Sequence, residues 1–215
     1  MPHPNSPIQD PYLGRPALLG FDHLIVAAMA LNTEVAKTTH GQSLTRLQRA
    51  ACQIIPNGFS IALSIRELIR TGYLFSAEIL LRPLIERVAV LSYLMTSGDS
   101  ALDLWEQGWP HKTRPSVKMM LDAVAEYDEF PEDIDVRQLT KQMIDRFNTV
   151  IHADPQGLDS NIGLTMGGQP GYLSGANLND PKTCDLICHL TMIFMTFLMK
   201  RAVTIFPDVP KHQLH

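Results

Sequence analysis

The chain has 215 residues, of which 45% are hydrophobic and 19% charged, and this composition excludes general disorder because the apolar surface can offset the chain entropy. The net charge of −4 excludes a protein coated with nucleic acid over its whole surface, although a local basic patch remains open. Three cysteines are too few and too uneven for a disulfide framework, so we expect a reducing, cytoplasmic compartment.

The predicted elements begin with a proline-rich segment. Residues 1–20 contain five prolines, which remove amide donors and restrict their neighbours, so we expect a flexible tail without a helix and without a signal peptide. Residues 21–206 form the expected domain, because apolar residues recur there three and four positions apart. Residues 207–215 form a second tail. The helices expected in the domain cover 21–39, 43–55, 59–70, 74–96, 100–107, 115–127, 136–152 and 181–206.

Prolines and glycines set the expected limits of these helices. The run Pro56-Asn57-Gly58 is expected to break or kink a helix, and Pro83 is expected to kink the next long one. Asp180 and Pro181 have the residue types of an N-cap and a first helical position. The last helix carries an apolar run of about 14 residues, shorter than the roughly 20 that span a bilayer, so we expect no membrane insertion.

Residues 153–180 depart from the helical pattern. This segment holds six glycines, and alternating apolar residues around Gly167-Gly168 predict a small β-hairpin, which we expect to act as a lid. The sequence therefore predicts an all-α protein: a single helical-bundle domain of about seven helices with one small β-hairpin insertion.

Several motifs of nucleotide and hydrolase chemistry are missing. The chain has no phosphate-binding loop, no dinucleotide fingerprint, no nucleophile elbow and no zinc-protease motif, so we expect no cofactor. Cys184 and Cys188 lie four residues apart, but a structural zinc site needs four ligands, and buried core thiols are the simpler interpretation. We therefore expect no metal.

The helix predicted over 136–152 carries the first candidate site. Its apolar residues, including Phe147, fall on one arc, and Arg146 lies beside that arc, about 120° from His152. His152 lies near the helix C-terminus, where the macrodipole favours an imidazolium. Two interpretations stay open: Arg146 and His152 are catalytic, or His152 caps the helix and Arg146 is an internal ion-pair partner.

The helix predicted over 74–96 carries the second candidate site. Glu78, Arg82 and Glu86 are four residues apart and form one polar stripe on an apolar rod. This stripe is either a surface ladder worth a few tenths of a kcal/mol per pair, or the lining of a polar cavity or of a contact with the Arg146 helix.

The segment 81–86, Leu-Arg-Pro-Leu-Ile-Glu, followed by Arg146-x5-His152-Ala-Asp, resembles the HEPN superfamily (higher eukaryotes and prokaryotes nucleotide-binding). It is closer still to an uncharacterised bacterial family with an R-x3-E helix, a later histidine and a Gly-rich hairpin. The resemblance covers about residue 61 to the last helix. It implies an all-helical homodimer, and in many members a metal-independent endoribonuclease of a bacterial stress, toxin–antitoxin or defence system.

The resemblance also implies residue roles. Arg146 would stabilise the charge on the phosphorane, and His152 would act as general acid or base on the ribose 2′-hydroxyl or the leaving oxygen. Active members often place a polar residue after the arginine, where this chain has Phe147. The alternative is a non-catalytic helical module that binds a nucleotide, RNA or a protein partner. The supporting polar groups of the catalytic site would be Arg82, Glu86, Asn148 and Asp154. In the alternative, Arg82, Glu86 and Arg146 form a structural ion network.

The loop between the helices predicted over 100–107 and 115–127 is a third candidate. Aromatic faces beside cations can hold a base and its phosphate, and Trp109, His111, Lys112 and Arg114 have these types. The alternative is a loop with one buried tryptophan and solvated basic residues.

Overall fold

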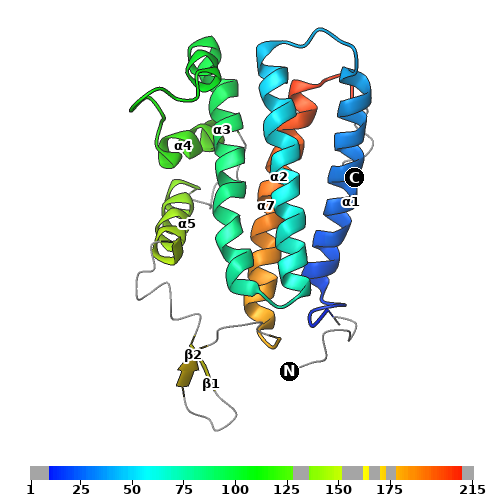
Figure 1. Cartoon of the computed structure of the whole chain (residues 1–215), viewed down its shortest axis with the longest axis vertical. Helices are drawn as coiled ribbons and strands as arrows, with labels where there is room; N and C mark the ends of the chain where they lie inside the picture. Colours follow the sequence, from blue (N-terminus) through cyan, green and yellow to red (C-terminus); the bar gives the residue numbers. More distant parts are fainter. Residues whose placement is uncertain (1–9, 128–135, 152–161, 165–169, 173–177, 210–215) are drawn as a thin grey trace.

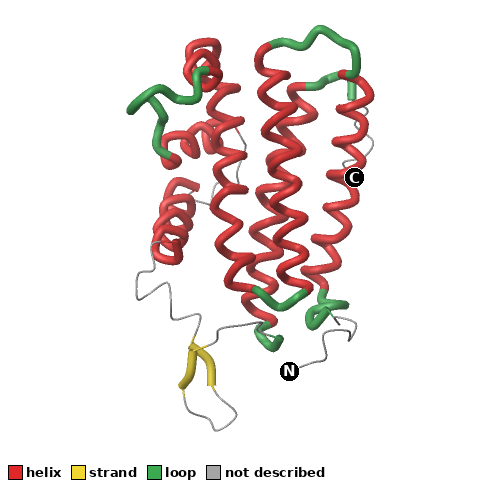
Figure 2. Tube along the Cα trace, in the orientation of Figure 1, coloured by secondary structure: helices red, strands yellow, loops and turns green. Residues whose placement is uncertain are grey.

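The computed structural model describes residues 10–127, 136–151, 162–164, 170–172 and 178–209. Helices make up nearly all of the regular structure in this part of the chain, so the predicted all-α class is confirmed (Figure 2). Six helices are described where about seven were expected. Their bounds are α1 Pro16–Thr39, α2 Arg46–Arg70, α3 Leu74–Glu106, α4 Val117–Tyr127, α5 Val136–Ile151 and α7 Pro181–Ile205.

Four of the helices, α1, α2, α3 and α7, stand side by side as a bundle, and α4 and α5 pack along the outer side of α3 (Figure 1). The interior is filled by large apolar side chains that exclude water, and their burial is the main favourable term in folding. Examples with 1% exposure or less are Phe21, Phe59, Leu84, Phe147 and Leu198.

Two short strands lie within the Gly-rich segment 153–180. β1 (Ile162–Leu164) pairs with β2 (Pro170–Tyr172) in antiparallel register, with Ile162 opposite Tyr172. The residues between the two strands, and most of the segment expected to form a lid, lie outside the described residues.

The expected break at Pro56-Asn57-Gly58 is wrong, because α2 runs through these residues without interruption. An internal proline removes one helical hydrogen bond and costs about 3 kcal/mol. Ile55 and Phe59 are both buried on either side of Pro56, and their packing offsets that cost.

The backbone likewise stays helical at Pro83, and the interruption of α3 comes at Gly98, whose φ of 70° and ψ of −156° lie outside the helical region. The two helices expected over 74–96 and 100–107 are therefore joined in α3 across this one glycine. A residue with a side chain adopts this conformation only with strain, so glycine suits the position.

Helix ends show where local signals succeed. Asp180 accepts a hydrogen bond from the amide of Thr183, as its N-cap role predicted. Thr45 caps α2 in the same way, and its partner Gln48 completes a capping box. The expectation of a tail through residue 20 is wrong, because α1 begins at Pro16, where a proline sacrifices no helical hydrogen bond.

The end of the described chain also departs from the expected tail 207–215. Val209 is buried against the core instead of extending into solvent. Pro207 and Asp208 are exposed, so Val209 alone among the described residues of this segment packs on the domain.

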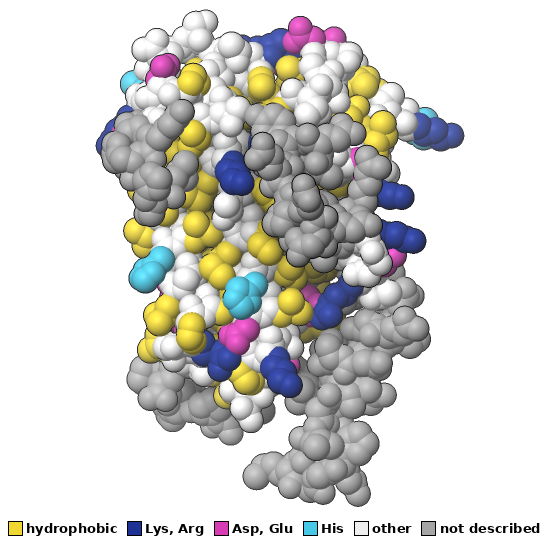
Figure 3. Space-filling view, turned by 180° about the vertical axis from the view of Figure 1, so that it is seen from behind, with side chains coloured by type: hydrophobic (Ala, Val, Ile, Leu, Met, Phe, Trp, Pro, Cys, Tyr) yellow, Lys and Arg dark blue, Asp and Glu magenta, His cyan; other side chains and the backbone are white. Residues whose placement is uncertain are grey.

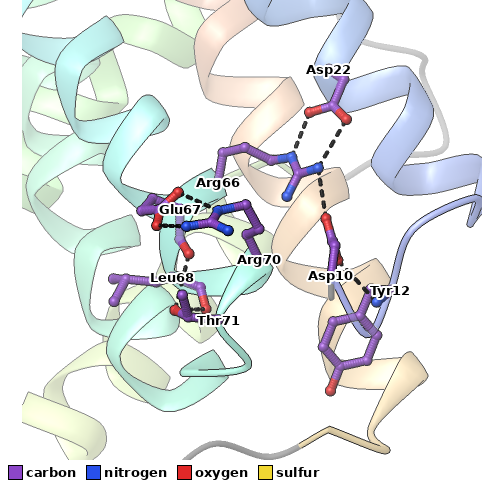
Figure 4. Close-up of polar contacts among 8 residues, drawn as sticks. All are labelled: Asp10, Tyr12, Asp22, Arg66, Glu67, Leu68, Arg70 and Thr71. Carbon is purple, nitrogen blue, oxygen red and sulfur yellow. Dashed lines mark hydrogen bonds and ion pairs between the residues drawn. The ribbon is translucent and has the colours of Figure 1, made fainter. Parts of the chain in front are cut away.

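The residues before α1 are fastened to the bundle by ion pairs. Arg66 of α2 donates to Asp22 of α1 and also contacts Asp10 at 2.8 Å, so one guanidinium joins three parts of the chain (Figure 4). Arg15 pairs with Asp185 at the start of α7. The hydrogen bond from Arg15 lowers the pKa of the Asp185 carboxyl.

Helices α2 and α7 approach closely at a glycine. A Cβ placed on Gly58 would lie 2.4 Å from Cδ1 of Leu198, well inside the contact distance of two carbon atoms. A Cβ at this position would force the end of the Leu198 side chain to shift.

Helices α1 and α7 are long and apolar enough to cross a membrane by length and composition alone. We expected no membrane insertion from an apolar run of about 14 residues, but the whole of α7 is 25 residues long. Half of the apolar window of α7 is buried inside the bundle, as in the core helix of a globular protein, while only 28% of the α1 window is buried. Hydrophobic side chains gather on the face seen in Figure 3.

Candidate functional site

The candidate site centres on an ion pair between α5 and α3. Arg146 donates from Nε and from its second guanidinium nitrogen to Oε1 of Glu78, at 2.8 and 2.6 Å. The Glu78 side chain is only 4% exposed, whereas that of Arg146 is 53% exposed. The buried Glu78 carboxylate therefore binds two nitrogens of the Arg146 guanidinium, while about half of the Arg146 side chain reaches solvent. Such a charge-assisted contact fixes the orientation of the planar group.

A second ion pair continues along the same face of α3. Arg82 donates to Glu86 at 3.1 Å and reaches the side-chain oxygen of Asn148 on α5 at 3.5 Å. Arg114, from the loop before α4, donates to the other oxygen of Glu86 at 3.3 Å. The polar stripe of α3 thus faces α5 and the loop before α4. The interpretation of the stripe as a surface ladder is therefore wrong.

These contacts follow from how each helix packs. The neighbours of Glu78 along α3, Ala77 and Leu81, are buried, and Phe147 on α5 is 1% exposed. Burying Phe147 places Arg146, the preceding residue, at the edge of the contact between the two helices. From this edge its long side chain reaches Glu78 while its end stays in water.

The ion network, meaning the Arg146–Glu78 pair together with the Arg82–Glu86–Arg114 group, carries a net positive charge. Its guanidinium groups belong to Arg82, Arg114 and Arg146, and its carboxylates to Glu78 and Glu86. One positive charge is therefore left over beside two half-exposed arginines, Arg114 and Arg146. Planar guanidinium groups bind phosphate and carboxylate groups through paired N–H donors, so the arrangement suits an anion such as a phosphate and disfavours a cation.

The structure places some of the predicted site residues together and leaves others outside the described residues. Arg146, Arg82, Glu86 and Asn148 meet at the junction of α3 and α5. His152 and Asp154 follow the last described residue of α5 and lie outside the described residues.

The residues of the third candidate site, the loop before α4, lie in different surroundings. Arg114 joins the ion network through Glu86, while His111 and Lys112 are exposed. Trp109 is half-buried against the core, and its ring lies 6.4 Å from that of Tyr93 in a tilted arrangement. The indole is therefore partly engaged within the protein, between the two interpretations of this loop.

The sequence placed Glu78 on the polar stripe of α3 but did not include it among the supporting polar groups of the site. Glu78 lies one helical turn before Arg82 on the polar stripe, and this spacing was its only local signal. Its burial and its pairing with Arg146, 68 residues away, depend on how α5 packs against α3.

The cysteines of α7 form a buried pair, as expected. Cys184 and Cys188 are both inaccessible to solvent. Their shared hydrogen bond, together with burial, raises the pKa of Cys188, so that thiol stays protonated at neutral pH. Among the described residues, no group of three or more His, Cys, Asp or Glu side chains is arranged to hold a metal ion.

Comparison of the chain with models of protein families, with curated proteins and with solved structures gave no match.

Proposed function

We propose that this protein is a HEPN-like, cytoplasmic RNA-binding protein that cleaves RNA as part of a bacterial stress or defence system. The observation that carries the proposal is the guanidinium of Arg146, held on its inner side by buried Glu78 and open to solvent on its outer side. A preorganised cation of this kind is suited to a phosphate whose charge grows during reaction.

The proposed reaction needs proton transfer and charge stabilisation. The ribose 2′-hydroxyl loses its proton to a base, and its oxygen forms a bond to the adjacent phosphorus. The bond from phosphorus to the 5′-oxygen breaks, and that oxygen takes a proton from an acid, leaving a 2′,3′-cyclic phosphate and a 5′-hydroxyl. We assign the proton transfers to His152 and the charge stabilisation to Arg146.

The experiment is cleavage of mixed total RNA in EDTA by wild type, His152→Ala and His23→Ala. His23 is an exposed histidine of α1, so its loss controls for the removal of a surface imidazole. We expect wild type and His23→Ala to produce cyclic phosphate ends and His152→Ala to produce none. Equal cleavage by all three proteins would point to a contaminating nuclease and contradict the proposal.

A second function is favoured by the same network. Arg146 and Arg82 each spend donors on a glutamate of α3, as expected for a non-catalytic module whose ion pairs are structural. In that case the protein binds a nucleotide, RNA or a protein partner without changing it. Absence of cleavage by any variant, with retained affinity for RNA, would select this function.

We also propose that the protein is a homodimer. The composition supports it, because 45% of the residues are hydrophobic and only 19% charged. Exposed apolar side chains on α1 and α7, such as Val26 and Ile193, leave apolar surface for a partner to cover. Light scattering of the purified protein in solution should give twice the mass of one 24.0 kDa chain.

A further inference from the structure

A cavity of about 420 Å³ lies between α1 and α2, at the end of the bundle where α1 and α7 terminate. None of its lining residues belongs to α3, α4 or α5, so it is separate from the ion network described above. Its volume falls within the range of small-molecule sites in proteins. The walls are mostly apolar and include Val35, Ile55 and Phe206.

The polar lining of the cavity includes Asn32, Thr39 and His40, whose side chains carry donors, and one backbone acceptor without its helical partner. Pro56 lines the cavity and has no amide hydrogen, so the carbonyl of Cys52, one turn earlier, lacks its usual helical donor. Cys52 lines the same cavity. In addition, α1 ends beside it at Thr39 and His40, and the C-terminal end of a helix carries partial negative charge.

We propose that this cavity binds a small amphiphile, an apolar molecule that carries a hydroxyl or amino donor. The apolar body packs against the walls, and the donor satisfies the free carbonyl of Cys52. A carboxylate head group brings no donor to this carbonyl and lies near the negative end of α1, so an alcohol should bind more tightly than the carboxylate of the same length, even with Asn32 and His40 in the lining. This site is independent of the proposed ribonuclease activity.

The thiol of Cys52 can report on binding to the cavity through its rate of alkylation. It is half-buried in the cavity wall, whereas Cys184 and Cys188 are inaccessible to solvent. A maleimide should therefore alkylate Cys52 alone, and a bound molecule should slow that reaction. Burial raises the pKa of the Cys52 thiol, so all rates must be compared at one fixed pH.

The experiment measures alkylation of Cys52 by N-ethylmaleimide, located by peptide mass spectrometry, with increasing 1-octanol or with octanoate. We expect octanol to slow alkylation at least fivefold at saturation and octanoate at the same concentration to slow it much less. Octanol without effect, or octanoate with an equal effect, would overturn the proposal. Failure of Cys52 to react in the absence of octanol would contradict an open cavity.

Two variants test the cavity space and the Cys52 carbonyl separately. Ala36→Phe places a ring in the cavity from an exposed position of α1, and octanol should no longer change the alkylation rate. Pro56→Ala restores an amide donor to the Cys52 carbonyl, and the octanol concentration for half protection should rise about fivefold. An unchanged concentration would overturn the role of the carbonyl. Circular dichroism and thermal unfolding confirm that each variant is folded.

Discussion

Replacing Arg146 by alanine should destabilise the protein through the carboxylate that it leaves behind. The Glu78 side chain is 4% exposed and accepts two hydrogen bonds from Arg146. Breaking a fully buried pair costs about 3–5 kcal/mol, but Arg146 is half-exposed and water can partly replace it, so we expect about 2 kcal/mol. For a chain of this length, that loss lowers the thermal midpoint by about 4–8 °C.

Arg70 provides a matched control for the assay, which is thermal unfolding followed by circular dichroism. It also donates two hydrogen bonds to one glutamate, but that partner, Glu67, is 57% exposed. Arg70→Ala should therefore leave the midpoint nearly unchanged. If Arg70→Ala and Arg146→Ala lower the midpoint equally, burial of the carboxylate is not the cause.

A double variant tests the mechanism further. Glu78→Met replaces the carboxylate by an apolar side chain of similar length, so it should restore most of the stability lost in Arg146→Ala. A double variant as unstable as the single one would refute the argument from a stranded charge.

Three further predictions concern the scaffold. Gly58→Ala should cost about 1 kcal/mol in denaturant unfolding, because the strain of displacing Leu198 exceeds the roughly 1 kcal/mol that alanine gains over glycine inside a helix; an unchanged midpoint would mean that Leu198 moves aside without strain. Thr45→Ala removes the N-cap of α2 and should cost about 1 kcal/mol in the same assay. Asp185 has a lowered pKa, so its pairing with Arg15 stabilises the fold above its unfolded-state pKa and is lost as pH falls through the folded-state pKa. Asp185→Asn should therefore flatten the loss of stability between about pH 5 and pH 2, and an unaltered acid profile would contradict the pairing.

Much of the fold could be predicted because it follows local periodicity. The spacing of three and four residues identified the helices, and Asp180 marked the start of α7 correctly. The continuity of α2 through Pro56 could not be predicted, because burial of the flanking residues Ile55 and Phe59 outweighs one lost hydrogen bond. Local rules weigh the proline but not the packing around it.

The candidate site divides in the same way. The stripe of Glu78, Arg82 and Glu86 could be read from the sequence, because spacing of four residues fixes a common helix face. The partner of each side chain could not, since Arg146 reaches Glu78 across 68 residues of chain. The clamp of Arg66 between Asp10 and Asp22 had no local signal either, because the three residues share no helix face.

The most direct test of the account is the affinity of Arg146 variants for single-stranded RNA. Fluorescence anisotropy of a labelled RNA oligonucleotide would be measured at one salt concentration, in proteins that also carry His152→Ala so that no cleavage occurs. Arg146→Lys keeps the charge beside Glu78 but loses the paired donors of the guanidinium, and Arg70→Lys is the matched control. We predict about tenfold weaker binding for Arg146→Lys and unchanged binding for Arg70→Lys. Equal affinity of both variants for RNA would contradict recognition of phosphate by Arg146.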